Sequence, residues 1–266
     1  MKDTVFAGNI PELYDSLLVP LIFEPYAEDM ARRVEKRAPA RVLEVAAGTG
    51  VVTRALDRTL PAVAVLVASD LNAPMLERAQ KSAFRRPIEW KVADALQLPF
   101  GDSEFDAVVC QFGAMFFPDK VKAFSEARRV LRPGGAYLFN VWDRIETNEF
   151  ADVVTRALAD LHRDDAPRFL ARTPHGYHQA DAIRADLAAA GFEDPEIETL
   201  AFESTAESAR IPALAYCHGT PLRNEIEAAG PLAVATDAAT EAIARRFGPG
   251  RVVGKISAHV VIAART

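Results

Sequence analysis

A short strand-like run that ends in a glycine loop constrains the fold of this chain more than any other feature. Residues 41–50 read Arg-Val-Leu-Glu-Val-Ala-Ala-Gly-Thr-Gly, and a helix-like stretch follows at once over 51–60. A strand, a tight turn and a helix N-terminus in this order let backbone N–H groups approach a ligand closely. Glycine suits the turn because it adopts positive φ and has no Cβ to hold a ligand away. We therefore expect a small-molecule site at this loop.

The carboxylate of Glu44 indicates which kind of ligand the loop accepts. An anion beside a helix N-terminus repels a phosphate, whereas it attracts a cationic or amine-bearing ligand. The dinucleotide-binding pattern GxGxxG would also need a glycine at position 53, where this chain has Thr53. Both observations disfavour a dinucleotide and favour a ligand that carries positive charge.

Apolar strands and amphipathic helices alternate through the first half of the chain. We expect strands at 42–45, 62–69, 88–92, 105–110 and 136–142, and helices at 51–60, 73–83 and 119–131, the last one ended by residues 132–135. Near-continuous apolar strands separated by helices are typical of a parallel sheet covered on both faces. A ligand of such a sheet lies outside the carboxyl ends of the strands. The residues that directly follow each strand are therefore the candidates for binding.

The segments on either side of this alternation are more helical. Apolar residues at helical spacing predict a helical segment over 12–37, which Pro20 and Pro25 are expected to break into pieces. Beyond Trp142 the spacing predicts helices at 150–161, at 181–190 and through most of 206–247, with breaks at Pro212, Gly219, Pro221, Gly230 and Gly248, and strands at 196–202 and 256–264.

These patterns predict five parts along the chain. They are an N-terminal helical lid (1–37), a ligand-binding core (38–142), a helical insertion with continuation of the sheet (143–205), a helical cap (206–250) and a closing strand of the core sheet (251–266).

Composition argues against several other classes of protein. The chain has 266 residues, half of them hydrophobic, which is enough for a sizeable core. A net charge of −6 without a long basic run disfavours a nucleic-acid partner. No 18-residue apolar stretch and no signal-peptide pattern is present, so we expect neither a membrane span nor secretion. Cys110 and Cys217 lie far apart, which predicts neither a disulfide framework nor a metal site and fits the cytoplasm.

Four expected strand ends carry distinctive side chains. They are the loop Glu44–Gly50, Asp70, the pair Asp94 and Ala95, and Gln111. An acid such as Asp70 can accept both hydrogens of a ribose diol, and an acid at position 94 can accept from the exocyclic amine of adenine, with the Ala95 amide available to a ring nitrogen. Each acid alone is typical of an ordinary turn or cap. All four in order, each at a strand end, indicate one site.

The chain resembles the class I S-adenosylmethionine-dependent methyltransferases, of the small-molecule type related to ubiquinone and menaquinone biosynthesis. The resemblance rests on VLEVAAGTG (42–50), SDLNAPMLERA (69–79), VADALQLPF (92–100), FDAVVCQFGAMFFPD (105–119) and VLRPGGAYLF (130–139). It implies an α/β fold, a Rossmann-like doubly wound and mostly parallel seven-stranded sheet with helices on both faces, together with the inserted cap and the N-terminal lid. It also implies S-adenosyl-L-methionine as the cofactor.

The resemblance implies a role for each strand-end residue. Glu44 would face the methionine amino group, directly or through water, and Gln111 would lie near the methionine or sulfonium part. Backbone contacts would come from the loop at Ala46, Gly48 and Gly50. The family usually has glycine where this chain has Ala46, which puts one backbone contact in doubt.

The other implied contacts are to the nucleoside. Asp70 would hold the ribose, with Leu71 and Met75 packed beside the adenine, although Met75 also fits plain helix–sheet packing. Asp94 and Ala95 would bind the adenine edge. A sulfonium and an ammonium on the cofactor agree with the carboxylate in the glycine loop, which was inferred independently from its charge.

The implied activity is methyl transfer by in-line displacement to oxygen, carbon or nitrogen of a small acceptor. The aromatic and apolar stretch 111–118 favours a largely apolar or aromatic acceptor. A base is needed only if the acceptor loses a proton, and the candidates are His175, His178, His218 and Tyr14, each of which also fits a loop, capping or lid role. The acceptor, the base and the oligomeric state stay open, a homodimer included.

Two other functions remain as alternatives. The first is a non-catalytic protein that binds S-adenosylmethionine, since a fold alone does not imply catalysis. The second is a nucleotide-dependent oxidoreductase, which Glu44 and Thr53 disfavour.

Overall fold

The computed structural model describes residues 8–163 and 165–266. The chain divides into two compact units. The first, called the core unit, comprises Glu24–Val141, Tyr177–Thr199 and His259–Thr266. The second, called the helical unit, comprises the residues up to Phe23, Trp142–Gly176 and Leu200–Ala258. The earlier division into lid, core, insertion, cap and closing strand stays a prediction.

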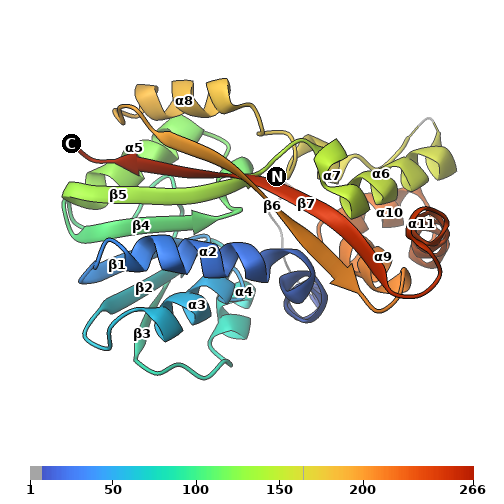
Figure 1. Cartoon of the computed structure of the whole chain (residues 1–266), viewed down its shortest axis with the longest axis horizontal. Helices are drawn as coiled ribbons and strands as arrows, with labels where there is room; N and C mark the ends of the chain where they lie inside the picture. The colour runs from blue at the N-terminus through green and yellow to red at the C-terminus, as the bar shows by residue number, and fades with distance from the viewer. Residues whose placement is uncertain (1–7, 164) are drawn as a thin grey trace. The chain divides into compact units, whose positions relative to one another are not determined.

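A seven-stranded sheet is the framework of the fold (Figure 1). Its strands are β1 (Arg41–Val45), β2 (Val65–Asp70), β3 (Ile88–Val92), β4 (Phe105–Gln111), β5 (Leu131–Trp142), β6 (Glu196–Ala206) and β7 (Val252–Ala264), in the order β3-β2-β1-β4-β5-β7-β6. The five strands from β3 to β5 are mutually parallel. Backbone bonds pair Gly135 with Arg265 and Asp143 with Ser257, so β7 runs antiparallel to β5. The predicted mostly parallel, seven-stranded α/β sheet is confirmed.

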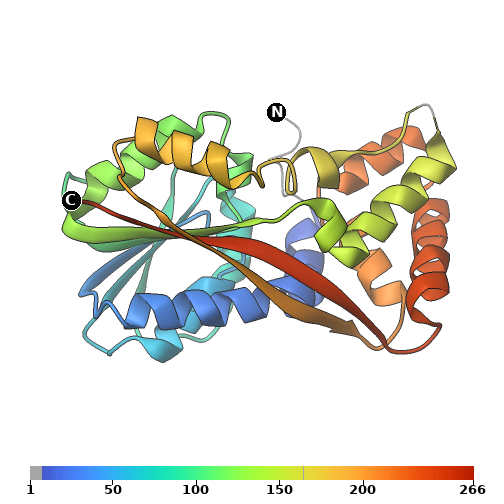
Figure 2. The ribbon, with the colours of Figure 1, turned by 45° about the horizontal axis from the view of Figure 1, so that its top comes forward.

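Different helices cover the two faces of the core sheet. On one face, apolar residues of α2 (Glu24–Glu35) and α3 (Val51–Thr59) pack with Val42 and Leu66 of the sheet. On the same face Leu76 of α4 (Ala73–Ala79) packs against Ala68 of β2. On the other face lie α5 (Lys120–Val130) and α8 (Ala180–Ala189), which pack together and lie side by side in Figures 1 and 2. The alternation of side chains along each strand produces this division.

The aromatic core under α5 follows from the same alternation. Phe124 of α5 lies 5.7 Å from Tyr137 and 5.2 Å from Phe139, between ring centroids, and both partners are on β5. The intervening Leu138 belongs to the opposite core, beneath α2 and α3. A strand buried on both faces reads as a continuous apolar run, which is why this segment was predicted correctly.

An ion pair anchors the segment between α4 and β3. Arg86 Nε lies 2.9 Å from Asp57 Oδ1, and the two side chains are only 6% and 3% exposed. The guanidinium also donates to four carbonyl oxygens at the end of α3 and just beyond it, those of Asp57, Leu60, Pro61 and Ala64. These carbonyls have no partner inside the helix, so one buried cation satisfies several acceptors at once.

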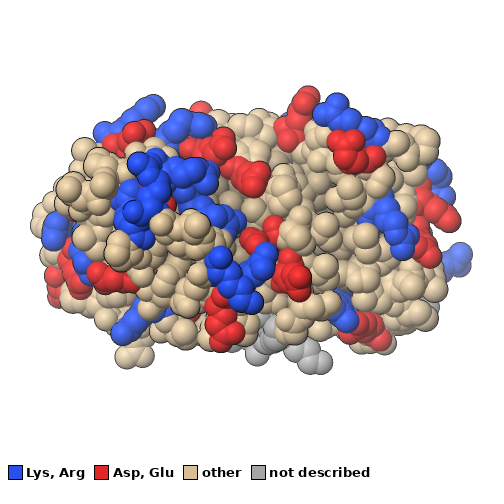
Figure 3. Space-filling model, turned by 90° about the horizontal axis from the view of Figure 1, so that it is seen from below, with Lys and Arg blue, Asp and Glu red and all other residues tan. Residues whose placement is uncertain are grey.

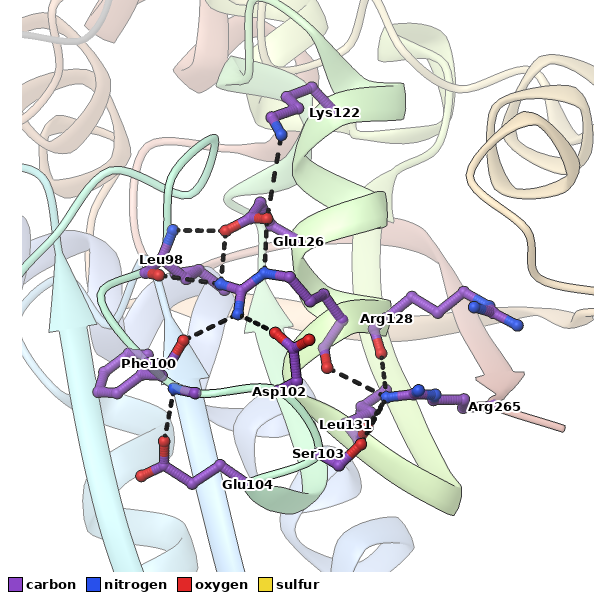
Figure 4. Close-up of polar contacts among 12 residues, drawn as sticks. Leu98, Phe100, Asp102, Ser103, Glu104, Lys122, Glu126, Arg128, Leu131 and Arg265 are labelled. Carbon is purple, nitrogen blue, oxygen red and sulfur yellow. Dashed lines mark hydrogen bonds and ion pairs between the residues drawn. The ribbon is translucent and has the colours of Figure 1, made fainter.

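The loop 93–104, between β3 and β4, is held against α5 by two side chains. Arg129 donates to the carbonyl oxygens of Leu98 and Phe100, and Glu126 accepts from the Leu98 amide at 2.9 Å (Figure 4). Arg129 and Glu126 also pair with each other at 2.8 Å, and this hydrogen bond is the main reason that the pKa of Glu126 is lowered. The loop that starts at the carboxyl end of β3 is therefore fixed by charge-assisted hydrogen bonds.

The stretch 132–135 was expected to separate a helix from a strand. Helix α5 ends at Val130, within one residue of the expected end, but β5 begins at Leu131 and not at 136, so that it includes Pro133, Gly134 and Gly135. A Cβ at Gly135 would lie 2.8 Å from the carbonyl oxygen of Asp106, so glycine permits close strand pairing there. The register with β4 is irregular at this point, which is where a strand tolerates proline and glycine.

The N-terminal segment is helical without the predicted breaks. It runs as α1 (Ile10–Leu13), the π-helix η2 (Tyr14–Phe23) and α2. Pro20 lies inside η2 and Pro25 in the first turn of α2, where a missing N–H costs little. The wider π-helical winding accommodates Pro20 without interrupting the helix.

The helical unit contains most of the remaining helices. Besides α1 and η2 they are η4 (Ile145–Thr147), α6 (Glu149–His162), α7 (Phe169–Arg172), α9 (Arg210–His218), α10 (Leu222–Ala229) and α11 (Leu232–Phe247). Asn148, just before α6, exchanges two hydrogen bonds of 3.0 and 3.1 Å with the backbone of Ser257 in β7. Gly219, Gly230 and Gly248 follow helix ends as predicted, whereas Pro212 lies in the first turn of α9 and does not break it.

The surface carries both signs of charge. On the face seen in Figure 3, acidic and basic side chains alternate with neutral ones, and one larger group of Lys and Arg is visible. Among the described residues, no helix is both long and apolar enough to cross a membrane.

Candidate cofactor site

The loop after β1 combines three residues with positive φ. They are Ala46 at 56°, Gly48 at 57° and Gly50 at 82°. The Ala47 amide donates to the carbonyl of Ser69 at 2.9 Å, which ties the loop to the end of β2. A Cβ at Gly50 would lie 3.1 Å from the Cβ of Ala79, so α3 and α4 approach closely there. The predicted strand, turn and helix are present, and the turn is as tight as its glycines suggested.

Ala46 fits into the site because residue 113, in the loop after β4, is a glycine. A Cβ at Gly113 would lie only 2.5 Å from the Cβ of Ala46 and 2.7 Å from Sγ of Cys110. Ala46 therefore occupies space that Gly113 leaves free. Its left-handed backbone costs an alanine roughly 1–2 kcal/mol, and the conformation persists because the surrounding loop fixes it.

Asp70 ends β2 and joins two neighbouring loops. Its Oδ2 accepts from the Gly48 amide at 2.8 Å, and its Oδ1 accepts from the Asn72 amide at 2.7 Å. The residue is 7% exposed, and burial raises the pKa of the carboxyl against the opposing effect of these hydrogen bonds. Nδ2 of Asn72 also donates to Oδ1, over a long 3.4 Å. Oδ2 therefore keeps a lone pair for a ligand, and Oδ1 can accept a ligand hydrogen in place of that long contact.

Glu44 lies deeper in the same site. It is 3% exposed, two residues beyond Val42 and on the same face of β1, beneath α3. Its Oε2 accepts from the hydroxyl of Thr53 on α3 at 2.5 Å. Burial raises the pKa of Glu44 to about 8, opposed by the Thr53 hydroxyl and by Arg54. A nearby cation favours the ionised form of such a buried acid, so the site is suited to a cationic ligand.

The ends of β2 and β3 present the other predicted residues next to Asp70. Leu71 is 55% exposed, an unusual position for a large apolar side chain, whereas Met75 is buried in α4. The Ala93 amide donates to the carbonyl of Asp70 at 3.0 Å, which brings Asp94 and the buried Ala95 beside it. An exposed leucine beside a row of acceptors is suited to cover a flat apolar ring.

Gln111 ends β4, on the other side of β1. It is half-buried and pairs in register with Asn140 of β5. Asn140 was not predicted: its Oδ1 accepts from the Phe112 amide at 3.0 Å, and its buried Nδ2 has no hydrogen-bond partner among the described residues. Phe112 has a φ of 51° and packs edge-on against Tyr26 at 5.2 Å. Nine of the ten predicted cofactor residues thus lie at the carboxyl ends of adjacent strands or in the loops that follow them, and Met75 lies in the first turn of α4.

The four candidate bases are divided between the units. Tyr14, His175 and His218 belong to the helical unit, and His178 belongs to the core unit. Nδ1 of His175 lies 2.9 Å from the carbonyl oxygen of Asp143, and Tyr14 stacks on Phe23 with ring centroids 5.0 Å apart.

His218 is another candidate base with a hydrogen-bond partner, and His259 is a further buried histidine. Nε2 of His218 lies 2.9 Å from Oγ1 of Thr236, and burial lowers the pKa of His218. His259, which the sequence reasoning missed, lies on β7 between Oγ1 of Thr199 and the carbonyl oxygen of His178, each at 2.9 Å. Its apolar surroundings in the sequence gave no sign of these polar partners.

Comparison with known proteins identifies the family. Residues 43–139 match the family model described as a methyltransferase domain. The chain is 36% identical over 168 residues to the demethylmenaquinone methyltransferase of Thermus thermophilus, a match that covers 59% of this chain and 76% of the relative. The chain belongs to the class I S-adenosylmethionine-dependent methyltransferases. S-adenosylmethionine is its cofactor and methyl transfer its activity.

Other matches agree with this assignment. The ubiquinone/menaquinone biosynthesis C-methyltransferase UbiE of Pseudomonas aeruginosa is 29% identical over 170 residues, covering 59% of this chain and 66% of that protein. A crystal structure of a putative methyltransferase from Bacillus halodurans has the same fold, with a TM-score of 0.56 and 23% identity over 90% of this chain and 98% of that one.

Proposed function

We propose that the methyltransferase holds S-adenosylmethionine at the ends of β1 to β4. The donors and acceptors there are Glu44, Ala46, Gly48, Gly50, Asp70, Asp94, Ala95 and Gln111, with Leu71 and Met75 as apolar neighbours. The cofactor carries an ammonium and a sulfonium, and when bound it supplies an activated methyl group. The carboxylates of this site fit a positively charged ligand, and the exposed Leu71 fits the flat adenine ring.

The observation that carries the proposal is the position of Asp70. Its two oxygens are fixed by amides from the glycine loop and from the start of α4. A carboxylate held in this way can accept the two hydroxyl hydrogens of a ribose without rearranging its own loop. Its neighbour Leu71 extends into solvent from the same strand end, where an adenine would shield it.

We infer that the acceptor is a small, largely apolar or aromatic metabolite of the quinone type. The names of the Thermus and Pseudomonas relatives support this class of acceptor. Within the loop after β4, Phe112 and Met115 are buried, whereas Phe116 and Phe117 are half-buried and Pro118 is exposed. Part of this loop therefore belongs to the core, and the rest is accessible to an apolar ligand.

Orientation of the acceptor supplies much of the rate in this proposal. Holding two reacting atoms in line can contribute about 7–11 kcal/mol in well-aligned systems. A hydroxylated ring becomes a stronger nucleophile when it loses a proton, and a neutral imidazole can accept that proton. We propose His218 as the first of the four candidates to test, because burial lowers its pKa and keeps it neutral near pH 7.

Calorimetric binding of S-adenosylmethionine tests the cofactor site. Asp70→Asn is expected to weaken binding by tenfold or more, because the amide offers one acceptor where the carboxylate offers two. Asp119→Asn is the matched control, since Asp119 also accepts a backbone amide, that of Lys122 at 2.9 Å, but caps α5 elsewhere in the core unit. Equal affinities of both variants and the wild type would refute this role of Asp70.

Transfer of a labelled methyl group from S-adenosylmethionine tests the acceptor, with cell extract separated into small-molecule, protein and nucleic-acid fractions. We expect label in the small-molecule fraction, and first of all in hydroxylated naphthoquinols that lack the ring methyl. Label confined to protein or nucleic acid would overturn the proposed acceptor class while leaving the cofactor site intact. Cofactor binding without transfer to any fraction would favour the non-catalytic alternative.

A further inference from the structure

The hydroxyl of Thr53 holds Glu44 in a place that water hardly reaches. Thr53 and Glu44 are 1% and 3% exposed, and the distance from Oγ1 to Oε2 is 2.5 Å. Thr53 is in the first turn of α3, directly after the glycine loop. Position 53 is also where the dinucleotide pattern would need a glycine. The threonine found there makes a specific hydrogen bond to Glu44.

The other charged and titratable groups around Glu44 do not neutralise it. Arg54 is the nearest cation, but its guanidinium donates to the carbonyl of Thr49 at 2.7 Å and lies 3.3 Å from the hydroxyl of Ser82. Asp70 adds negative charge from β2, and Cys110 on β4 is buried, with its pKa raised to about 12. Burial outweighs the attraction of Arg54, so the pKa of Glu44 is raised to about 8 and the side chain keeps a proton at neutral pH.

We propose that Thr53 is a positioning residue that prepares Glu44 to ionise, and that binding of the cofactor's ammonium expels one proton from Glu44. This inference rests on the proposed cofactor site. The balance is simple: the carboxylic acid and the ammonium ligand become a carboxylate–ammonium pair, and the proton passes to solvent. Thr53 donates to the carboxylate oxygen and so favours the ionised form that the ligand requires.

Proton release measured by calorimetry tests the first part. Binding heats of S-adenosylmethionine are compared at pH 6–7.5 in two buffers that differ in ionisation enthalpy. We expect about one proton released per cofactor bound at pH 6.5, and an affinity that rises close to tenfold per pH unit below the pKa of Glu44. Glu44→Gln should bind with no comparable release. Methylthioadenosine, which keeps the nucleoside but lacks the amino-acid tail, should bind wild type without release.

Three threonine variants test the positioning role. Thr53→Val removes the hydroxyl at nearly constant volume, and we expect about tenfold weaker binding at pH 7 with the affinity plateau moved to higher pH. Thr53→Ser should restore both properties. Thr59→Val is the matched control in the same helix, because the Thr59 hydroxyl donates to the Ala55 carbonyl at 2.8 Å, and this variant should bind as wild type does.

The outcomes separate this inference from the proposed site. Tight binding without proton release at pH 6.5 would overturn proton expulsion, while leaving the cofactor site intact. An unchanged pH profile in Thr53→Val, or a Thr53→Ser variant no better than Thr53→Val, would overturn the positioning role. A wild-type protein that binds neither S-adenosylmethionine nor methylthioadenosine would contradict the proposed cofactor site itself.

Discussion

Gly113→Ala is expected to destabilise the protein through one crowded point in the cofactor loops. Gly113 has φ −99° and ψ −36°, which alanine adopts freely, so backbone strain plays no part. The new Cβ would lie 2.5 Å from the Cβ of Ala46 and 2.7 Å from Sγ of Cys110. Both distances are far below an ordinary van der Waals contact of about 3.5–4.0 Å between carbon atoms. One of the two loops must therefore move.

The magnitude follows from the cost of overpacking. Extra methyl groups in a packed interior cost about 1–3 kcal/mol, which corresponds to a fall of roughly 2–12 °C in the thermal midpoint for a chain of this size. Adding Ala46→Gly removes the shorter contact and the left-handed alanine together. We expect Ala46→Gly to stabilise the Gly113→Ala protein more than it stabilises wild type, with a coupling of about 0.5–3 kcal/mol.

Thermal and denaturant unfolding of the four proteins in this cycle measure the coupling. Gly101→Ala serves as the control, because among the described residues a Cβ there would meet only Oε2 of Glu104, at 3.6 Å. Its effect should stay within about 0.5 kcal/mol. Strict additivity of Ala46→Gly and Gly113→Ala, or a Gly113→Ala variant as stable as wild type, would refute the reasoning.

Two further predictions concern buried charge. Arg86→Leu removes the ion-pair partner of Asp57 and the donor to several carbonyls, so we expect the free energy of unfolding to fall by about 3–5 kcal/mol in denaturant. Arg210→Leu is the control, because its ion pair with Asp237 is exposed, and it should cost less than about 1 kcal/mol. Between pH 4.5 and 8 the folded protein keeps a proton on Glu44 that the unfolded chain loses, so the free energy of unfolding without cofactor should fall as pH rises. Glu44→Gln should remove that part of the slope, which amounts to about 5 kcal/mol at most; parallel pH profiles for the variant and wild type would contradict it.

The inner strands β1 and β4 could be predicted because both of their faces are buried, and their bounds were predicted to within one residue at each end. The half-exposed edge strand β3 was predicted with the observed bounds. Leu138, between Tyr137 and Phe139, illustrates the reason: each of the three is buried, so the apolar run is continuous and has one interpretation. The helix expected at 119–131 is observed as α5 (Lys120–Val130), one residue shorter at each end.

The wrong predictions depend on contacts that are distant in sequence. Gly135 is an ordinary helix-ending residue in the sequence, and only the fold brings the carbonyl of Asp106 on the neighbouring strand close to it. Pro20 was expected to break a helix, because a sequence pattern gives no sign of a π-helical winding.

The candidate site was predictable in its strand ends and not in its supporting residues. Asp70 is revealed by its place after an apolar run, which is a local signal. Thr53, Gly113 and Asn140 matter only through partners brought near by the fold. A covarying pair such as Ala46 and Gly113 would be the signal to seek in related sequences.

The boundaries between the two units have a practical consequence for engineering and for evolution. Four of the five fall within or between directly adjoining regular elements: at the junction of η2 and α2, and inside β5, β6 and β7. Domains usually meet in exposed linkers that tolerate cutting and grafting. Here, truncation or recombination at those four points would sever a helix or a strand. We therefore expect the chain to tolerate substitution and loop insertion better than exchange of whole segments, because the hydrogen-bonded strands are then retained.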